Sequence, residues 1–210
     1  MRGIFITFEG PEGGGKSLQI EKLKEYLQET GREVVVVREP GQTSIGEQIR
    51  QILLNPKNKE MEPRAETLLF ESARAQLVEE VIKPALAVGK IVLADRFFDS
   101  TTAYQGYGRG MNLKEIDWLN RFATGGLVPD LTILLDVPVE VGLERRRKSG
   151  KEDRLDKEGL EFHQRVREGY LKIAKSQPER WRVVNASRSP EEIFEEIKGL
   201  VEEKLKEIQK

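Results

Sequence analysis

A glycine-rich segment near the N-terminus carries the residues whose types and spacing point most directly to chemistry. Residues 10–17 read GPEGGGKS, a complete G-x-x-x-x-G-K-[ST] pattern. Such glycines let backbone N–H groups approach phosphate oxygens, the lysine can reach the β and γ phosphates, and the serine hydroxyl can ligate Mg²⁺. A strand-like run before the segment and an amphipathic pattern after it disfavour a chance glycine-rich turn. The residues expected to bind the triphosphate are Gly10, Gly13, Gly14, Gly15, Lys16, Ser17 and Leu18.

A triphosphate site of this kind also needs a carboxylate at the end of a neighbouring strand to organise the metal. Asp95 and Asp136 each end an apolar run. Asp95 is followed by Arg96 and an expected loop rich in Ser, Thr and Tyr, whereas Asp136 is followed by Val-Pro. We therefore assign Asp95 with Ser17 to the metal and interpret Asp136 as mainly structural. Glu9 is a further candidate for an outer position around the metal.

Phe70 and Arg74 are four residues apart in a helical pattern, which places them on one helix face. An aromatic ring and a guanidinium one turn apart can stack on a nucleobase and hydrogen-bond its edge. By spacing alone the simpler alternative is favoured, in which Phe70 is a core residue and Arg74 is solvated.

Arginine and lysine residues are concentrated in the segment after the fourth apolar run, where residues 145–148 read RRRK and Arg154 follows. This composition suits a mobile lid that brings positive charge onto a transferring phosphoryl group. The alternative is a solvated helix face with pairs such as Glu144 with Lys148. Taken alone, the pattern does not separate the two interpretations.

The elements that must position these residues alternate between short apolar runs and long amphipathic stretches, as in an α/β protein with a mostly parallel sheet. The expected strands cover residues 4–8, 33–38, 91–94, 131–136 and 182–184. The expected helices cover residues 16–29, 44–54, 65–88, 113–124, 139–148, 160–176 and 190–208. No linker or repeat divides the chain, so residues 1–210 are expected to form a single domain.

Composition excludes several functional classes. The 35 Lys and Arg residues against 36 Asp and Glu residues give a net charge of −1, which disfavours binding to a nucleic acid backbone. The chain has no cysteine and one histidine, so thiol chemistry and histidine-built centres are not expected. His163 lies in a polar helical pattern and is expected to be solvated. No apolar run is long enough to span a membrane, and the N-terminal segment is a strand pattern, so a cytoplasmic location is expected.

Several motifs occur together in an order and spacing that resemble the thymidylate kinase family. They are the phosphate loop, Arg38-Glu39-Pro40-Gly41, Leu68–Arg74, Asp95-Arg96-Phe97, Ala103-Tyr104-Gln105-Gly106 and Asp153-Arg154-Leu155. The phosphate loop is common to many families, but Arg-Glu-Pro-Gly and Asp-Arg-Phe followed by Ala-Tyr-Gln are much more selective. The resemblance extends from the first strand to about Ala174.

The resemblance implies a P-loop kinase fold, with a five-stranded parallel sheet surrounded by helices, and a homodimer. It implies that Mg²⁺·ATP phosphorylates dTMP to dTDP in dTTP synthesis. Arg96 would bind the dTMP phosphate with help from Arg38, and Glu12 would accept a hydrogen bond from the sugar 3′-hydroxyl. Phe70 would stack on thymine. The residues implied to bind dTMP are Glu12, Arg38, Pro40, Phe70, Arg74, Arg96, Thr101, Tyr104 and Gln105.

Within this group, Arg74 and Gln105 would hydrogen-bond the thymine edge, and Tyr104, with Thr101 nearby, would crowd the 2′ position. Family members whose P-loop lacks a variable arginine supply the catalytic arginine from the lid, here about residues 142–156. This points to Arg147 and its neighbours, although Ser149 stands where relatives place another arginine. The residues implied to be catalytic are Lys16, Arg96, Arg147 and Glu12.

Two residues depart from the family pattern. Gln42 follows Gly41 where the family often has a second glycine, and Ser17 replaces the commoner threonine.

A GTPase switch is disfavoured because no N-K-x-D segment is present. A kinase for another pyrimidine nucleoside monophosphate remains an alternative, as does a nucleotide-gated binding module. The conformation of the bond before Pro40 is left open.

Overall fold

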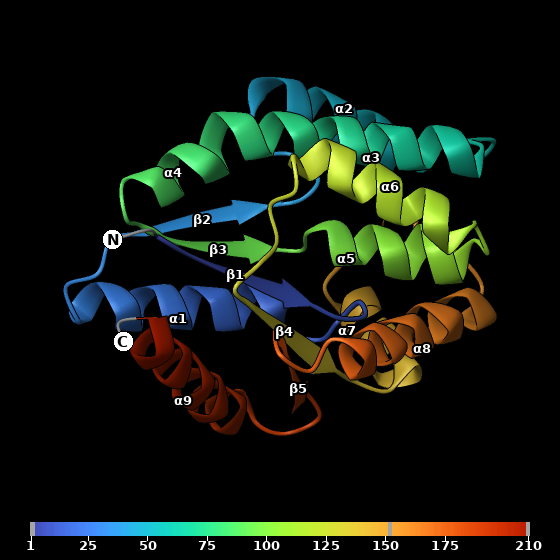
Figure 1. Ribbon diagram of the computed structural model, residues 1–210. Coiled ribbons are helices and arrows are strands. Elements are labelled where there is room, and N and C mark those ends of the chain that lie inside the picture. The colour runs from blue at the N-terminus through green and yellow to red at the C-terminus, as the bar shows by residue number, and fades with distance from the viewer. Residues whose placement is uncertain (1–2, 151–152, 209–210) are drawn as a thin grey trace.

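The computed structural model describes residues 3–150 and 153–208 and is built around one parallel β-sheet (Figure 1). Its five strands lie in the order β2-β3-β1-β4-β5, and every neighbouring pair is parallel. They are β1 (Ile4–Glu9), β2 (Val34–Arg38), β3 (Ile91–Asp95), β4 (Leu131–Asp136) and β5 (Trp181–Asn185). The expected α/β architecture, a five-stranded parallel sheet surrounded by helices, is confirmed.

Largely apolar runs explain which strands lie at the centre of the sheet. All six residues of β1 are buried, and only the last residue of β4 is partly exposed. Such strands are covered by helices on both faces and need no polar alternation. The two edge strands, β2 and β5, carry more exposed side chains.

The register brings the carboxyl ends of the central strands together. Phe8 of β1 and Arg38 of β2 both pair with Asp95 of β3. Polar residues at these strand ends therefore meet at one edge, which is where ligands bind in parallel α/β sheets. At the opposite edge, the beginning of β1 and the end of the last helix lie together, because Ile4, Leu205 and Ile208 line one hollow.

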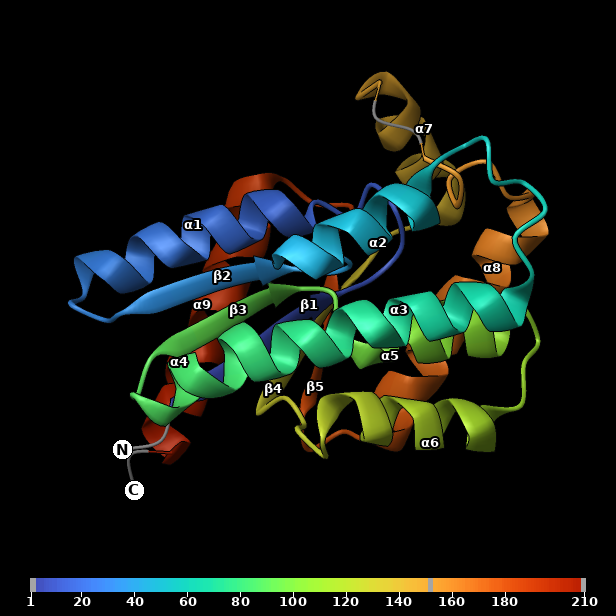
Figure 2. The same ribbon diagram turned by 90° about the horizontal axis from the view of Figure 1, so that it is seen from above.

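Helices cover both faces of the sheet (Figures 1 and 2). The α-helices are α1 (Lys16–Glu29), α2 (Ser44–Leu54), α3 (Pro63–Leu77), α4 (Lys83–Ala87), α5 (Phe98–Thr101), α6 (Leu113–Thr124), α7 (Val139–Lys148), α8 (Leu160–Ser176) and α9 (Pro190–Ile208). Two π-helical segments are η1 (Val78–Ile82) and η2 (Thr102–Gly108). Helices α1 and α9 contribute to one core cluster, and the run α3-η1-α4 contributes to a second. Helices α1, α2, α6, α7, α8 and α9 begin and end where the sequence pattern predicts.

The helix expected over residues 65–88 is a continuous helical run with a wider turn inside it. It begins at Pro63, because proline is favoured in the first turn of a helix, and it ends at Ala87. The π turn of η1 lies just before Pro84. Proline has no N–H to donate to residue 80, so a local change in helical geometry at this point is expected.

The prediction of an irregular segment after β3 is wrong, because residues 98–108 form α5 and η2. Gly106 and Gly108 allow this segment to pack closely against other helices. A Cβ atom on Gly108 would lie 2.7 Å from the Phe162 ring of α8, and one on Gly106 would lie 2.7 Å from Leu113. Contact with neighbouring helices, which local sequence does not reveal, therefore holds this segment in a helix.

The prediction that His163 is solvated is also wrong. Its side chain is buried on α8, in edge-to-face contact with Phe162. The buried stripe of α8 also includes Val166 and Tyr170, and His163 extends this stripe by one position. Burial lowers the pKa of His163, so the ring is held neutral.

None of the helices in residues 3–150 and 153–208 combines the length and the apolar character required to cross a bilayer.

Candidate active site

The phosphate loop has the geometry that its sequence predicts. Gly15 adopts φ 84°, a left-handed conformation that suits glycine, and caps the N-terminus of α1. Lys16 is buried, and its Nζ donates to the carbonyl oxygens of Gly10 and Pro11, both at 3.0 Å. Burial and the nearby Arg96 lower the pKa of Lys16 to about 8. The loop thus places one ammonium group and a helix N-terminus where phosphates would bind.

Ser17 and Asp95 form the pair expected at a metal site. The Ser17 hydroxyl donates to a carboxylate oxygen of Asp95 at 2.8 Å. No cluster of three or more acidic, His or Cys side chains suited to a metal occurs within the described part of the chain.

The structural interpretation of Asp136 agrees with its contacts. Both of its carboxylate oxygens accept hydrogen bonds from Arg167, at 2.7 and 2.9 Å. Glu9 is fully buried and accepts from the Phe97 N–H, the Ser100 hydroxyl and the Tyr170 hydroxyl. Burial raises the pKa of Glu9 to about 7. Glu9 therefore orders the segment after β3 and makes no direct contact with Ser17 or Asp95.

Arg96 occupies the centre of the site in a strained backbone conformation. Its φ is 72°, which is unusual for a residue with a side chain and is typical of functional positions. One guanidinium nitrogen donates to the Gly10 carbonyl at 3.1 Å and to the Tyr170 hydroxyl at 3.0 Å. The other donates to Glu12 at 2.6 Å and to Tyr104 at 3.1 Å. This cation links the phosphate loop to the helices that follow β3.

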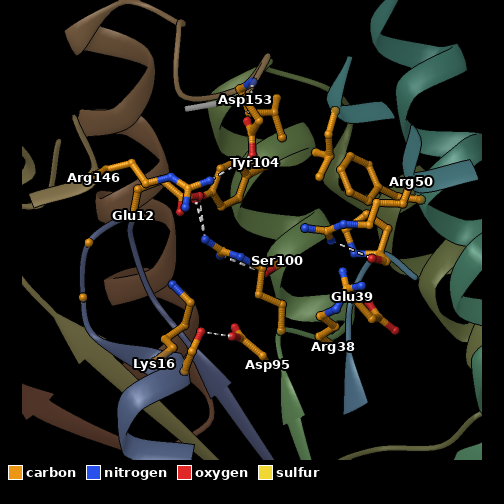
Figure 3. A pocket seen from close by; sticks show the side chains of 18 of the residues that line it. Glu12, Lys16, Arg38, Glu39, Arg50, Asp95, Ser100, Tyr104, Arg146 and Asp153 are labelled. Atoms are coloured by element: carbon orange, nitrogen blue, oxygen red, sulfur yellow. Dashed lines mark hydrogen bonds and ion pairs between the residues drawn. The ribbon is translucent and has the colours of Figure 1, made fainter. Parts of the chain in front are cut away.

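Glu12 is held ionised by its cationic neighbours. Burial alone would raise its pKa, but Arg96, Lys16 and a hydrogen bond from Tyr104 lower it to about 2. The Tyr104 hydroxyl donates to the same carboxylate oxygen as Arg96, at 2.8 Å (Figure 3). Glu12 can therefore only accept hydrogen bonds, which suits it to accept one from a sugar hydroxyl.

A cavity of about 450 Å³ joins the phosphate loop to the second group of predicted residues. Its lining includes Glu12, Gly13, Gly14, Gly15, Lys16, Ser17, Leu18, Arg38, Pro40, Phe70, Arg74, Asp95, Arg96, Thr101, Tyr104 and Gln105. The structure thus brings together nearly all of the residues selected from the sequence. Gly10 contributes through its carbonyl, and Arg147 is exposed on α7 outside this lining set.

Arg74 is not solvated, contrary to the simpler alternative. Its side chain is 1% exposed, and it donates to Glu39, Glu71, the Thr101 hydroxyl and the Phe97 carbonyl. Burial alone would lower the pKa of Arg74, but the two carboxylates raise it far above its usual range. Arg74 is therefore a fixed cation beside the cavity, with its N–H groups already engaged by protein acceptors.

Several contributors to the site carried no assigned role at the level of sequence. Glu39 belongs to the Arg-Glu-Pro-Gly motif, and burial raises its pKa to about 7. The bond between Glu39 and Pro40 is cis. Arg50 lines the cavity and donates to the Pro40 carbonyl at 2.7 Å. Nothing in the local sequence distinguishes Arg50 from a solvated helix residue. Gln42, noted as a departure, adopts φ 75°, the left-handed conformation that a glycine would favour.

The cationic segment expected to form a lid lies beside the cavity; its residues 151 and 152 are outside the described residues. Figure 2 shows α7 projecting from the body of the molecule. Arg145 and Arg146 line the cavity, and Arg146 donates to Asp156 at 2.9 Å and to Asp153 at 3.3 Å. Beyond α7, Arg154 is buried and donates through Nε to the Leu53 carbonyl of α2 at 2.8 Å.

Comparison with known proteins agrees with this site. The family model described as Thymidylate kinase matches residues 8–197. A thymidylate kinase from Carboxydothermus hydrogenoformans is 54% identical over 202 residues, covering 96% of this chain and 98% of the relative. One from Kosmotoga olearia is 50% identical, covering 92% and 93%. The crystal structure of thymidylate kinase from Ehrlichia chaffeensis superposes with a TM-score of 0.79 at 35% identity, covering 96% and 99%.

The phosphate loop, the residues expected to bind dTMP (the acceptor residues) and the cationic segment line one cavity. The likeness to these relatives extends over nearly the whole chain. The chain therefore belongs to the thymidylate kinase family.

Proposed function

We propose that this protein transfers the γ-phosphoryl group of ATP to dTMP, producing dTDP and ADP. The observation that carries the proposal is the single cavity lined by both the phosphate loop and the acceptor residues, with Arg96 between them. In-line transfer between two bound nucleotides requires both in one enclosure. Membership of the thymidylate kinase family supports dTMP as the acceptor.

In this reaction a dTMP phosphate oxygen attacks the γ-phosphorus while the bond to the bridging oxygen of ADP breaks. No covalent enzyme intermediate is needed, which agrees with a site built from cations and hydrogen-bond donors. Lys16 would hold the β and γ phosphates, and Arg96 would hold the acceptor phosphate. The lid arginines would cover the transferring group, with Arg147 able to act there only after it moves toward the cavity.

Ser17 and Asp95 would hold Mg²⁺, which when bound would supply positive charge to offset the negative charge that develops on the phosphates. The 2.8 Å contact between the two side chains supports this assignment, because both oxygens already point to one place. Asp95 would keep the serine hydroxyl oriented, and the phosphates would complete the site.

The acceptor site supports a pyrimidine deoxynucleotide. Phe70 lines the cavity as a half-buried ring able to stack on the base, and Pro40, Arg38 and Thr101 lie around the same space. Tyr104 is fixed between Arg96 and Glu12 and would restrict the space beside the sugar. Glu12 would accept from the 3′-hydroxyl.

The test is ADP release from Mg²⁺·ATP with dTMP, dUMP, dCMP, CMP, AMP and dGMP supplied separately. We expect dTMP to give the largest kcat/KM, with dTDP identified as the product. Preference for a purine monophosphate would contradict the proposal. ATP binding without release of ADP for any acceptor would indicate a nucleotide-gated binding module instead.

We also propose that the protein acts as a homodimer of single-domain subunits in the cytoplasm, where both nucleotides are available. Leu68 of α3 and Trp118 and Phe122 of α6 are at least half exposed, and the Trp118 and Phe122 rings stack at 5.5 Å. These rings present an apolar face to a second copy. Light scattering should give a dimer mass that Trp118→Glu reduces, whereas Val88→Glu, at a distant exposed site, should not. A monomer mass for the parent chain would contradict this.

A further inference from the structure

Glu66, on α3, is a completely buried carboxylate that contacts three donors from other parts of the chain. It accepts from Gln105 Nε2 at 2.8 Å and from Arg109 at 3.0 and 3.2 Å. It also forms an ion pair with Arg154 at 2.6 Å. Burial would raise the pKa of Glu66, but these hydrogen bonds and charges lower it instead. Glu66 is therefore ionised.

An ionised carboxylate determines which way the Gln105 amide is turned. The oxygen and nitrogen of an amide have nearly the same shape, so their positions are decided by the partners of each. Because Glu66 can only accept, the Nε2 of Gln105 must face it, and Oε1 must point elsewhere. Gln105 lines the cavity, and among the described residues no donor contacts Oε1. The cavity therefore meets this amide as an acceptor.

The orientation has a consequence for base selection. Thymine and uracil carry an N–H at position 3, whereas cytosine has a lone pair there and an amino group at position 4. A fixed acceptor can bind the N3–H of thymine, but it opposes the N3 lone pair of cytosine. Arg74 cannot turn to donate to the N3 lone pair of cytosine in place of Gln105, because its N–H groups are engaged by Glu39, Glu71 and Thr101.

We propose that Glu66 is a positioning residue that fixes the sense of the Gln105 amide and so makes the acceptor site select thymine over cytosine. The inference rests on the proposed function, because it requires a pyrimidine next to Gln105. It adds a residue that does not touch the base and acts on selectivity through another side chain.

The test compares kcat/KM for dTMP and for dCMP in the parent chain and in Glu66→Gln. A neutral amide at position 66 can donate or accept, so Gln105 gains freedom to turn over and to donate to the N3 of cytosine. We expect the dTMP-to-dCMP ratio to fall by about 10-fold to 100-fold, the usual effect of relieving one opposed buried pair. Merely structural damage would lower both values together and leave the ratio unchanged.

Arg109→Gln is the matched control, because it removes a different partner of Glu66 from the same buried cluster. Arg154 still pairs with Glu66 in this variant, so the carboxylate and the Gln105 orientation persist. We expect its dTMP-to-dCMP ratio to stay within about twofold of the parent value. If Glu66→Gln does not fold, the double variant Glu66→Gln with Arg109→Gln removes one charge of each sign and takes its place.

A measurement on the unmodified protein is independent of folding in the variants. In ¹⁵N NMR spectra, the Gln105 side-chain amide protons should exchange slowly with water both before and after dTMP binds, because Glu66 accepts from Nε2. Fast exchange of these protons in the free protein would show that Glu66 does not hold Nε2, and this would overturn the inference. So would an unchanged ratio in folded Glu66→Gln. Absence of activity with every acceptor would instead contradict the proposed function.

Discussion

Single ionisable groups at the cavity are set to fixed charge states by their neighbours. Arg96 and Lys16 keep Glu12 negative, since its pKa is lowered to about 2. The hydroxyls of Tyr104 and Tyr170 have pKa values raised well above 10, because burial disfavours their charged forms. Two groups are exceptions: burial raises the pKa of Glu39 to about 7, and the pKa of Lys16 is lowered to about 8. The charge of Lys16 is therefore sensitive to mildly alkaline pH.

The Lys16 pKa predicts how ATP affinity depends on pH. Below pH 8 the ammonium is charged and binds phosphate; above pH 8 the free protein loses this charge, and ATP must bind together with a proton. We expect the dissociation constant for ATP to rise about tenfold per pH unit above 8, until the contribution of the ammonium is lost. Calorimetry in two buffers of different ionisation enthalpy should detect the proton uptake at pH 9. Lys16→Met should show neither effect, and a flat profile in the parent chain would contradict the assignment.

Replacing Arg96 should impair use of the acceptor more than binding of ATP. Arg96→Ala removes the principal cation expected at the acceptor phosphate and leaves Glu12 without its ion-pair partner. Loss of charge-assisted hydrogen bonds of this kind costs about 1.5–3 kcal/mol, so kcat/KM for dTMP should fall roughly 10-fold to 150-fold. The dissociation constant for ATP, measured without acceptor, should change much less. Parental turnover of dTMP would refute the role of Arg96.

At the scale of elements, the site depends on backbones that approach each other closely. The phosphate loop packs directly on α7, since a Cβ atom on Gly142 would lie 2.2 Å from the Glu12 carbonyl oxygen. The end of α2 meets the segment after α7, where Arg154 donates to the carbonyls of Leu53 and Leu54. The cavity is thus bounded by elements in direct contact with one another.

The close approach at Gly142 predicts a strong effect of one methyl group. Gly142→Ala would push α7 away from the phosphate loop, and we expect a loss of about 1–3 kcal/mol in the free energy of unfolding together with a lower kcat. Gly159→Ala is the matched control, because a Cβ atom there meets nothing within 4 Å. Urea denaturation of both variants measures the difference. Equal stability of the two would mean that α7 and the loop are not in firm contact.

Across the whole molecule, three clusters of buried apolar residues share the same sheet. Phe5, Val92 and Ala94 face one cluster, while Ile4, Ile6 and Leu93 of the same strands face another. Since the two faces of each strand join different clusters, the clusters cannot separate without breaking the sheet. The chain should therefore unfold as one unit.

Calorimetry should accordingly show a single transition whose van't Hoff enthalpy equals the calorimetric enthalpy, expressed per cooperative unit. A ligand that binds only the folded state adds about 2.7 kcal/mol at 100 times its dissociation constant, so saturating dTMP should move the whole transition to higher temperature. Two resolved transitions, or a shift in only part of one, would contradict the single domain.

The strands and most helices could be predicted from the sequence because apolar runs and caps are local signals, and most of the cavity lining was predicted from the phosphate-loop motif and the family resemblance. Residues 98–108 could not be predicted as helical, since Gly106 and Gly108 serve contacts with other helices. Arg74 and His163 were expected to be accessible or left ambiguous, because burial depends on partners far along the chain. Glu66 gave no signal at all, as its donors come from residues 105, 109 and 154.

The positions of the start of β1 and the end of α9 relative to the cavity have a practical consequence. β1 begins and α9 ends at the amino edge of the sheet, whereas the cavity lies at its carboxyl edge. A tag, a fused protein or a solid support attached at the start of β1 or at the end of α9 would therefore stand on the far side from the nucleotides. Protein immobilised on a bead at the start of β1 or the end of α9 should have the opening of its cavity facing the bulk solution, which suits it to repeated use in a flow reactor.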